Sequence, residues 1–378
     1  MKIGITCYPT YGGSGIVATE LGQELAKRGH HVHFISSSLP RRLMELGDPI
    51  FYHEVEPKRY PLFEYVPYDL ALATKMVDVA NTFGLDLLHV HYAIPHAISG
   101  YLAREMVRPR RLPVITTLHG TDITLVGRDH SYLSVTQFGI RQSDGVTAVS
   151  EFLRDATLRE FCPDCEIRTI PNFIDTERVR RLASPELRAR FAPKGEKVLV
   201  HLSNFRPLKR ITDVIRVFEK VQREIPAVLI MIGDGVERSN AQHLVHELGI
   251  SRKVFFVGMV GMVESYLSVC DLMLLLSETE SFGLAALEAM ACEVPVVATD
   301  VGGLPELVSP GCNGALYPLG DIQGIVKGSL EILDDSNLER YMKNARRCAV
   351  ESFSIDKIVP MYEDYYREVL EGEPCPCP

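Results

Sequence analysis

The sequence predicts an α/β protein made of two Rossmann-like domains, each with a parallel sheet covered by helices on both faces. Strand-like and helix-like segments alternate along almost the whole chain, as they do in parallel sheets with crossover helices. The length of 378 residues exceeds one ordinary core and suits two such domains. A hydrophobic content of 46% and a charged content of 24% are typical of a globular protein.

The first domain is expected to span residues 1–170. Apolar segments predict six strands, at Lys2–Cys7, His31–Ser36, Asp86–Val90, Pro113–Leu118, Gly145–Ala148 and Glu166–Ile170. Helices are expected between them, near Ile16–Arg28, Asp69–Phe83, Ile94–Val107 and Glu151–Phe161. The segment Ile170–Asp175 then breaks the alternation and precedes a charged stretch, so it marks the domain boundary.

The second domain is expected to span residues 171–355. Its strands are predicted at Lys197–Asn204, Ala227–Ile232, Val254–Val257, Leu272–Ser277, Pro295–Thr299 and Ala315–Tyr317. Helices close the chain at Asp321–Asp334, Leu338–Ser352 and Asp356–Leu370, and we expect the last one, over residues 356–372, to pack back on the first domain. The two domains should face each other across a cleft at the carboxyl ends of both sheets, where α/β proteins bind ligands.

Composition argues against several classes of function. The formal net charge of −9 disfavours nucleic acid as the main partner. No apolar run reaches the length of a membrane span, and Met1 leads directly into a strand-like segment rather than a signal peptide. A cytoplasmic protein without an integral membrane segment is therefore expected. The oligomeric state stays open, a homodimer included.

The nine cysteines are mostly scattered, which is consistent with reduced thiols. Two close pairs need separate interpretation: Cys162 with Cys165, and Cys375 with Cys377. Together they could form a four-thiolate zinc site, exchange disulfides or remain free. None of the four is expected to be catalytic.

The most informative motif is the run Glu280–Glu288, which follows the apolar strand Leu272–Ser277. Ser281 is predicted to cap a helix over Gly283–Ala291, leaving the backbone N–H groups of residues 282–284 free to bind an anion. The carboxylates of Glu280 and Glu288 could then contact opposite ends of an elongated ligand such as a nucleotide sugar. The alternative is a capping-turn acid and a solvent-facing Glu288.

A glycine-rich loop, Gly12–Gly15, joins the first strand to the first helix. It meets the dinucleotide fingerprint only weakly, because the second strand ends Ile35–Ser38 without the acidic residue that would bind a ribose hydroxyl. The loop is expected to let a phosphate or carboxylate approach the backbone. A purely structural turn is the alternative.

Histidines follow two strands of the first domain. His119 lies at the carboxyl end of the fourth strand, where functional loops are found, and is the best placed of the twelve histidines to meet a ligand. His89 and His91 alternate onto one face of the third strand, which permits metal ligation. Because no third ligand is evident, packing and hydrogen bonding are favoured for that pair.

Three cations, Arg206, Lys209 and Arg210, follow the first strand of the second domain. Such a loop would hold a diphosphate, with arginine capable of bidentate contact, although a solvated basic loop is the alternative. Gly233–Gly235 and the turn around Gly258 close the next two strands. They are predicted to form tight turns over which a base could lie.

Together these motifs resemble the retaining glycosyltransferases of the GT-B architecture, in the large family that includes sucrose-phosphate synthases and bacterial mannosyltransferases. The resemblance covers nearly the whole chain and rests on Gly12–Gly15, His119, Pro171–Asp175, Arg206 with Lys209, Gly233–Gly235 and Glu280–Glu288. A closer resemblance within this family is carried by Cys7–Gly15, His89–Ala97, Leu118–Thr124 and Ser203–Pro207. It implies transfer of N-acetylglucosamine from its UDP donor to the hydroxyl of L-malate, a small dicarboxylate, with retained anomeric configuration. The cationic loop and the helix start would handle the charge of the leaving group, so no metal or other cofactor is expected.

The resemblance also implies roles for individual residues. Catalytic roles fall to His119, Glu280, Arg206 and Lys209. Donor binding falls to Gly15, Asn204, Arg210, Gly235, Gly258, Ser281, Phe282, Gly283, Leu284 and Glu288, and acceptor binding to Ser14, Tyr92, Thr121 and Arg128. One departure concerns Asn204, because many relatives have arginine at this position, five residues before the lysine.

Other functions remain open from the sequence. A relative could use another acceptor, such as an inositol phosphate, a lipid or a glycan. A nucleotide-sugar-binding regulator without turnover belongs to a different class, and the joint presence of the five candidate charged and histidine side chains speaks against it. A UDP-sugar epimerase shares the architecture but would consume the donor without any acceptor.

Overall fold

The computed structural model describes residues 1–378 except 10–12, 44–45, 59–60, 62–63 and 373–378. The chain divides into two compact units, each with its own parallel sheet. Unit 1 comprises Met1–Asn172 together with the chain from Asp356 onward, and unit 2 comprises Phe173–Ile355. Each unit is described by itself below.

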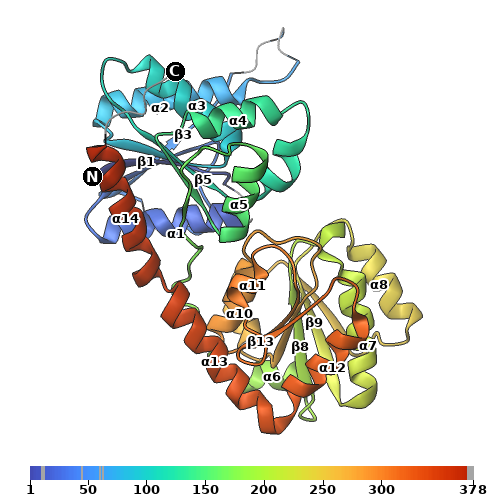
Figure 1. Ribbon diagram of the computed structural model, residues 1–378. Helices are drawn as coiled ribbons and strands as arrows, with labels where there is room; N and C mark the ends of the chain where they lie inside the picture. Colours follow the sequence, from blue (N-terminus) through green and yellow to red (C-terminus); the bar gives the residue numbers. More distant parts are fainter. Residues whose placement is uncertain (10–12, 44–45, 59–60, 62–63, 373–378) are drawn as a thin grey trace. The chain divides into compact units, whose positions relative to one another are not determined.

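Unit 1 is built on a seven-stranded parallel sheet of order β3-β2-β1-β4-β5-β6-β7. Its strands are β1 Lys2–Thr6, β2 His31–Ser36, β3 Ile50–Glu54, β4 Leu87–His91, β5 Val114–Leu118, β6 Gly145–Ala148 and β7 Arg168–Thr169. Its helices are α1 Gly13–Lys27, α2 Tyr68–Phe83, α3 Ile98–Met106, α4 Leu133–Arg141, α5 Glu151–Glu160 and α14 Ile355–Glu371, with short turns η1 Ala93–Ala97, η2 Thr121–Leu125 and η3 Val126–Arg128. Helices α2 and α3 cover one face of the sheet, and α1 and α14 lie on the other (Figure 1).

Unit 2 contains a six-stranded parallel sheet of order β10-β9-β8-β11-β12-β13. Its strands are β8 Lys197–Leu202, β9 Ala227–Ile232, β10 Val254–Gly258, β11 Leu272–Leu275, β12 Val296–Thr299 and β13 Gly314–Tyr317. Its helices are α6 Pro185–Phe191, α7 Ile211–Glu224, α8 Arg238–Glu247, α9 Val263–Leu267, α10 Leu284–Ala291, α11 Leu304–Leu307, α12 Ile322–Leu333 and α13 Asp335–Phe353, with a short turn η4 Pro207–Lys209.

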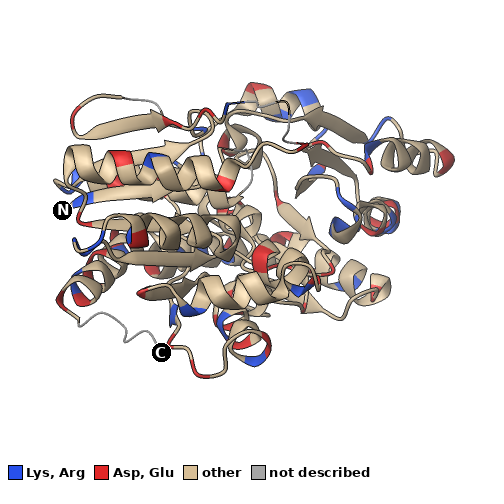
Figure 2. Cartoon of the chain, turned by 90° about the horizontal axis from the view of Figure 1, so that it is seen from above, with Lys and Arg blue, Asp and Glu red and all other residues tan. Residues whose placement is uncertain are grey.

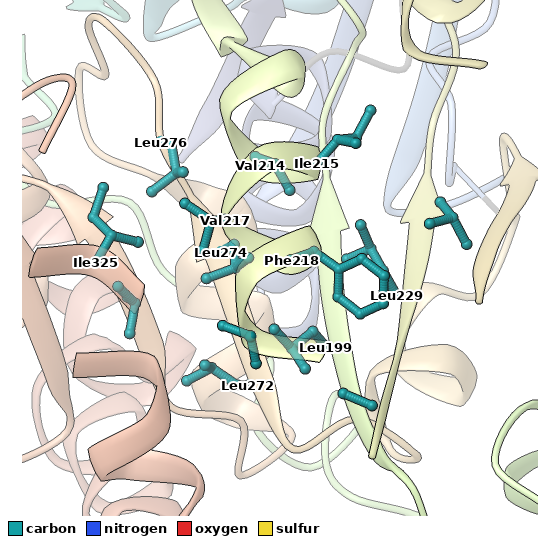
Figure 3. Close-up of a cluster of buried hydrophobic side chains, with 14 of the residues drawn as sticks. Leu199, Val214, Ile215, Val217, Phe218, Leu229, Leu272, Leu274, Leu276 and Ile325 are labelled. Carbon is teal, nitrogen blue, oxygen red and sulfur yellow. The ribbon is translucent and has the colours of Figure 1, made fainter. Parts of the chain in front are cut away.

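The core of unit 2 shows why these segments form helices on a sheet. Val214, Val217 and Phe218 recur at helical spacing on α7 and are fully buried against the apolar strands, as Figure 3 shows. The strands themselves are apolar on both faces, as a sheet covered on both sides requires. Charged residues of both signs are interspersed along the helices, while the strands carry few of them (Figure 2).

The elements of unit 1 differ from the predicted ones in four places. The strand β3 and the helix α4 were not expected; β3 is an edge strand whose residues are only half-buried, so its sequence lacks a continuous apolar run. The helix expected over Ile94–Val107 is interrupted, because Ile94 has extended backbone angles, and α3 begins only at Ile98. The last strand of unit 1 is limited to Arg168–Thr169.

The chain end belongs to unit 1. Tyr366 on α14 hydrogen-bonds His89 of β4 through its hydroxyl, at 2.7 Å, and the hydroxyl of Tyr365 accepts the N–H of Val146 on β6 at 2.9 Å. These contacts lock the last helix onto the sheet. Among the described residues, no helix is both long and apolar enough to cross a membrane.

Candidate active site

The strand order of unit 1 gathers candidate side chains at one edge of the sheet. Because β1, β4 and β5 are neighbours and parallel, the loops that follow them meet there. Tyr8 follows β1, Tyr92 follows β4 and His119 follows β5. The aromatic rings of Tyr92 and Tyr8 are 5.3 Å apart between centroids, and those of Tyr92 and His119 are also 5.3 Å apart.

Two of the predicted acceptor-binding residues, Tyr92 and Ser14, contact each other. The Tyr92 hydroxyl and the Ser14 Oγ at the start of α1 are 2.7 Å apart, so the glycine-loop helix and the β4 loop are joined directly. Burial raises the pKa of Tyr92 to about 12, so the phenol is neutral and acts as a hydrogen-bonding group. The residue has a φ of 89°, in the left-handed region that non-glycine residues rarely adopt.

The histidines at this edge form a buried, neutral cluster. Nδ1 of His91 and Nε2 of His119 are 2.8 Å apart, and Nδ1 of His96 donates to the backbone carbonyl of His91 at 2.6 Å. Burial lowers the pKa of His119 to about 3 and that of His96 to about 4, so these rings carry no charge at neutral pH. His119 retains partial exposure, which leaves part of its ring available to a ligand.

His89 and His91 pack and hydrogen-bond inside the sheet. Nε2 of His89 pairs with the Thr117 hydroxyl at 2.7 Å and its Nδ1 with Tyr366 at 2.7 Å, so both nitrogens are occupied by protein groups. The part of the chain that the structure describes contains no group of three or more His, Cys, Asp or Glu side chains able to hold a metal ion.

Asp122 is a site residue that sequence reasoning did not assign. Its carboxylate is 2% exposed and accepts backbone N–H groups of Gly120 at 2.9 Å, of Ala93 at 3.0 Å and of His119 at 3.3 Å. It therefore ties the loop after β5 to the loop after β4. Burial raises the pKa of Asp122, although these N–H groups act against the increase. The signal in the sequence was an acid two residues after a glycine at a strand end.

In unit 2 two of the predicted catalytic residues, Lys209 and Glu280, pair with each other. Lys209 Nζ donates to Oε1 of Glu280 at 2.5 Å, and the same oxygen accepts the Ser277 hydroxyl at 2.8 Å. The backbone N–H of Glu278 donates to the carbonyl of Leu208 at 2.8 Å, which joins the loop after β8 to the loop after β11. The basic loop and the Glu280 loop thus form one assembly at adjacent strand ends.

The remaining cations of this loop differ in their surroundings. Arg210 has a left-handed backbone, with φ of 46°, and its guanidinium donates to Asp213 at 2.6 Å and to Glu278 at 3.0 Å. Arg206 and Asn204 are exposed. The guanidinium of Arg210 is therefore held by acids of unit 2, while Arg206 extends toward solvent.

The helix start after Glu280 differs from the prediction. Gly283, with φ of 100°, occupies the N-cap position of α10, so the prediction that Ser281 caps the helix is wrong. A left-handed N-cap favours glycine, and a Cβ there would lie 2.7 Å from Leu304. The unpaired N–H groups consequently belong to the first turn from Leu284 onward rather than to Phe282, whose side chain is buried against Phe353.

Glu288 lies inside unit 2 rather than on its surface. The side chain is 8% exposed and lies in the buried face of α10, so the alternative of a solvent-facing acid is wrong. A buried carboxylate must have a polar or charged partner to offset its desolvation. Glu288 is therefore held in a defined position within the helix.

A glycine pair that sequence reasoning left without a role shapes the Glu280 loop. The N–H of Gly303 donates to the carbonyl of Glu280 at 2.9 Å, and a Cβ on Gly302 would lie 1.9 Å from that carbonyl oxygen. Only glycine permits this approach of two backbones. In the sequence, this role could have been inferred from two consecutive glycines shortly after a strand.

The predicted tight turns after β9 and β10 are confirmed. Gly233, Gly235 and Gly258 have φ values of 123°, 155° and 75°, all in the region that favours glycine. A Cβ on Gly235 would lie 2.6 Å from the carbonyl oxygen of Phe205, so this turn packs directly on the basic loop. A nucleotide base at these exposed turns remains a prediction.

Comparison with known proteins identifies the family. Residues 11–178 match the domain described as Glycosyltransferase Family 4, and residues 184–348 match Glycosyl transferases group 1. The chain is 48% identical over 375 residues to N-acetyl-alpha-D-glucosaminyl L-malate synthase from Bacillus anthracis, covering 99% of this chain and 98% of that protein. This chain belongs to glycosyltransferase family 4.

Solved structures share the fold of this family 4 glycosyltransferase. Sucrose-phosphate synthase from Thermosynechococcus elongatus superposes with a TM-score of 0.80 at 23% identity, covering 98% of this chain and 99% of that one. Anabaena HepE, solved with UDP and glucose, gives 0.81 at 22% identity, covering 97% and 99%. The predicted GT-B architecture with its two Rossmann-like parallel sheets is confirmed.

Other predicted positions of the glycosyltransferase have mixed outcomes. Gly15 is buried in the first turn of α1, Thr121 is exposed at the start of η2, and Gly12 lies outside the described residues. Arg128 is 49% exposed and forms a bidentate ion pair with Glu160, with both N···O distances 2.6 Å. An acceptor carboxylate would have to displace Glu160 from this guanidinium.

The structure decides between the alternatives for one cysteine pair of the glycosyltransferase. Cys162 and Cys165 form a disulfide, because the turn between them brings their Cα atoms to 5.4 Å, within the usual range for such a bond. The sequence left a zinc site, disulfides and free thiols open for this pair, and the structure contains the disulfide. Joined sulfurs supply no zinc thiolates, and Cys375 and Cys377 lie outside the described residues.

Proposed function

We propose that the protein transfers N-acetylglucosamine from UDP-N-acetylglucosamine to the hydroxyl of L-malate, the first step of bacillithiol synthesis. The observation that carries this proposal is the near full-length relation, at 48% identity, to a protein that bears this activity in its name. The joint placement of Lys209, Glu280 and Ser277 at one strand edge supports a nucleotide-sugar site. A cytoplasmic location belongs to the same proposal.

The donor is assigned to unit 2. Lys209 and the exposed Arg206 would neutralise the charge that develops on the departing UDP, an electrostatic effect that usually dominates such catalysis. A sugar hydroxyl would replace part of the Lys209–Glu280 contact, with Glu280 accepting its hydrogen bond. Glu288 would bind the ribose, and the N–H groups at the start of α10 would contact the phosphates or the far edge of the sugar.

The acceptor is assigned to unit 1. Ser14, Tyr92 and Thr121 would supply hydrogen bonds to malate, and Arg128 would bind one carboxylate after leaving Glu160. His119 would orient the donor sugar. Each of these assignments rests on the proposed function and on the position of the side chain in the segments that follow β1, β4 and β5.

The proposed reaction is attack on the same face of the sugar from which UDP leaves. The acceptor oxygen forms a bond to the anomeric carbon while the bond from that carbon to the β-phosphate oxygen breaks. The acceptor proton passes to the departing β-phosphate, so the configuration is retained without a protein nucleophile. The cationic side chains supply the stabilisation of charge, so the proposal requires no divalent metal.

The test is incubation of the purified protein with UDP-N-acetylglucosamine, excess chelator and a panel of acceptors. UDP release that depends on L-malate, with an N-acetylhexosaminyl malate found by mass spectrometry, is the expected result. Turnover with an inositol phosphate instead of L-malate would show that the protein is a glycosyltransferase with another acceptor. Donor consumption without acceptor would indicate an epimerase, and UDP binding without any turnover a regulator.

A further inference from the structure

The buried histidines of unit 1 carry information about where their protons reside. Nδ1 of His96 lies 2.6 Å from the backbone carbonyl oxygen of His91. A carbonyl oxygen only accepts hydrogen bonds, so Nδ1 of His96 must carry the hydrogen. The ring is neutral, because burial lowers its pKa to about 4, and Nε2 of His96 therefore has a lone pair. That nitrogen is buried and has no partner among the described residues.

The contact between His91 and His119 allows two arrangements. In one, Nδ1–H of His91 donates to Nε2 of His119, at 2.8 Å, and Nε2 of His91 has a lone pair. In the other, Nε2–H of His119 donates to Nδ1 of His91, and Nε2 of His91 carries a hydrogen. Neutral imidazole has only one hydrogen bound to nitrogen. Each arrangement therefore fixes which nitrogen of each ring is the donor and which is the acceptor.

Burial separates the two arrangements. His91 is fully buried, and its Nε2 has no hydrogen-bond partner within the residues that the structure describes. The second arrangement would leave an N–H donor unpaired in the interior, and among backbone groups an orphaned buried N–H is rarer than a carbonyl oxygen short of a partner. The first arrangement leaves only a lone pair there, as the structure also does at Nε2 of the adjacent His96.

We propose that His91 is a positioning residue that holds His119 in the tautomer with its hydrogen on Nδ1. The role of His119 toward the substrate rests on the proposed function, whereas the tautomer rests on the two ring contacts and the burial of His91. Both rings stay neutral, since burial lowers the pKa of His91 well below its ordinary value and that of His119 to about 3.

This tautomer restricts what His119 can do. Nε2 accepts from His91, so Nδ1, the other nitrogen of this partly exposed ring, carries the N–H group. An N–H donor recognises an oxygen with a free lone pair, on a sugar hydroxyl, an acyl group or a phosphate. It cannot take a proton from the acceptor hydroxyl. In this tautomer His119 is excluded as the general base.

The experiment reads the tautomer directly. Protein labelled with nitrogen-15 in histidine is studied at pH 7.5 by long-range proton–nitrogen correlation, and the His119 signals are assigned with His119→Gln. We expect a protonated Nδ1 and an unprotonated Nε2 at His119 in the unmodified protein. In His91→Leu the hydrogen should move to Nε2, the form that neutral histidine favours in water. His119 with its hydrogen on Nε2 in the unmodified protein, or no change in His91→Leu, would overturn the proposal.

Two further variants separate positioning from loss of structure. His91→Asn keeps an amide donor near the position of Nδ1 and is expected to retain the His119 tautomer. His33→Leu removes another buried histidine from the same sheet, one that pairs with His53 at 3.0 Å, and should leave the His119 signals unchanged. Loss of the tautomer in His33→Leu would mean that the effect is general destabilisation, and the assignment to His91 would fail.

Kinetics with the donor and malate give an independent measurement. His91→Leu should lower kcat/KM for the donor about tenfold, the upper range for one neutral hydrogen bond, while His91→Asn recovers most of it. Equal loss in both variants would contradict the proposal. If no acceptor supports turnover, the proposed function fails, yet the nitrogen spectra still decide the tautomer.

Discussion

The candidate residues of unit 1 and those of unit 2 differ in their electrostatics. In unit 1 the rings around His119 are neutral: imidazoles with lowered pKa values and a tyrosine whose pKa is raised to about 12. The acid beside them, Asp122, is held by backbone N–H groups. In unit 2 the side chains are ions in direct contact, Lys209 with Glu280 and Arg210 with Glu278 and Asp213. Both units are built on parallel sheets, so the fold does not dictate this difference.

The difference indicates a division of tasks. A diphosphate carries several negative charges and is bound by cations. Cations that pair with an acid of the protein can release that acid and bind the ligand instead. A neutral imidazole and a buried phenol offer a ligand directed hydrogen bonds rather than a charge. We therefore interpret unit 2 as the part that handles the charge of the leaving group and unit 1 as the part that aligns the reacting hydroxyl.

The largest expected difference between the units is their response to acid. Burial lowers the pKa of six histidines in unit 1: His33, His53, His89, His91, His96 and His119. In the described part of unit 2, His201 shows the same effect, with a pKa of about 4. These groups bind protons near pH 6.5 when unfolded but not when folded, so stability present above pH 6.5 is lost as the pH falls toward 4.

Each fully buried histidine contributes about 1.4 kcal/mol per pH unit in that window, so unit 1 should weaken several times more steeply than unit 2. Asp122 acts in the opposite direction, since its raised pKa favours the folded state in acid. Hydrogen exchange read by mass spectrometry at pH 7 and pH 5 would measure each unit separately. Equal loss of protection in both would contradict the contrast between them.

The next largest effect is expected from Lys209→Met. It removes the cation proposed to stabilise the leaving phosphate and leaves Glu280 without its partner at 2.5 Å. We expect kcat to fall about 10²- to 10³-fold, as for loss of one preorganised electrostatic contact. Lys343→Met, which breaks an exposed pair with Glu339 at 2.6 Å, is the control and should leave turnover unchanged. Normal turnover in Lys209→Met would contradict the role of unit 2.

A smaller effect is expected from Asp122→Asn. The amide NH2 cannot accept the backbone N–H groups that one carboxylate oxygen now accepts, and each unpaired donor costs about 1–3 kcal/mol. Urea unfolding should show this loss, and hydrogen exchange should rise at Ala93, His119 and Gly120. Asp129→Asn, an exposed acid that accepts the N–H of Ser131, is the matched control. Unchanged exchange at Ala93 would show that Asp122 does not join the two loops.

The smallest change in stability is expected from Arg128→Ala. Its pair with Glu160 is half-exposed, so its loss should cost about 0–1 kcal/mol. Under the proposed function, KM for malate should nevertheless rise far more than KM for the donor, while Glu160→Gln, which releases the guanidinium, should lower KM for malate. Equal effects on both KM values would show that Arg128 does not bind the acceptor. The proposed acceptor residues of unit 1 would then be the neutral ones.

Local patterns predicted most strands and helices, because apolar runs and 3.6-residue periodicity report burial directly. They also placed Lys209, Glu280 and His119 at strand ends, since functional loops follow strands in α/β sheets. They did not reveal Asp122 as a link between loops, because its partner Ala93 is 29 positions away and is reached through its backbone N–H. Nor did they predict the cap of α10, where the left-handed angle of Gly283 prevailed over the capping preference of Ser281.

The sequence by itself determined the fold class, the two parallel sheets and the residue types at their carboxyl edges. Periodicity and strand-end position depend on neighbours along the chain. Only the tertiary structure decided which of those residues meet: His91 with His119, Lys209 with Glu280, Arg128 with Glu160. Those pairings follow from the strand order and from burial. Burial determines whether each side chain is charged, and the pairing determines which of its atoms is left to bind a ligand.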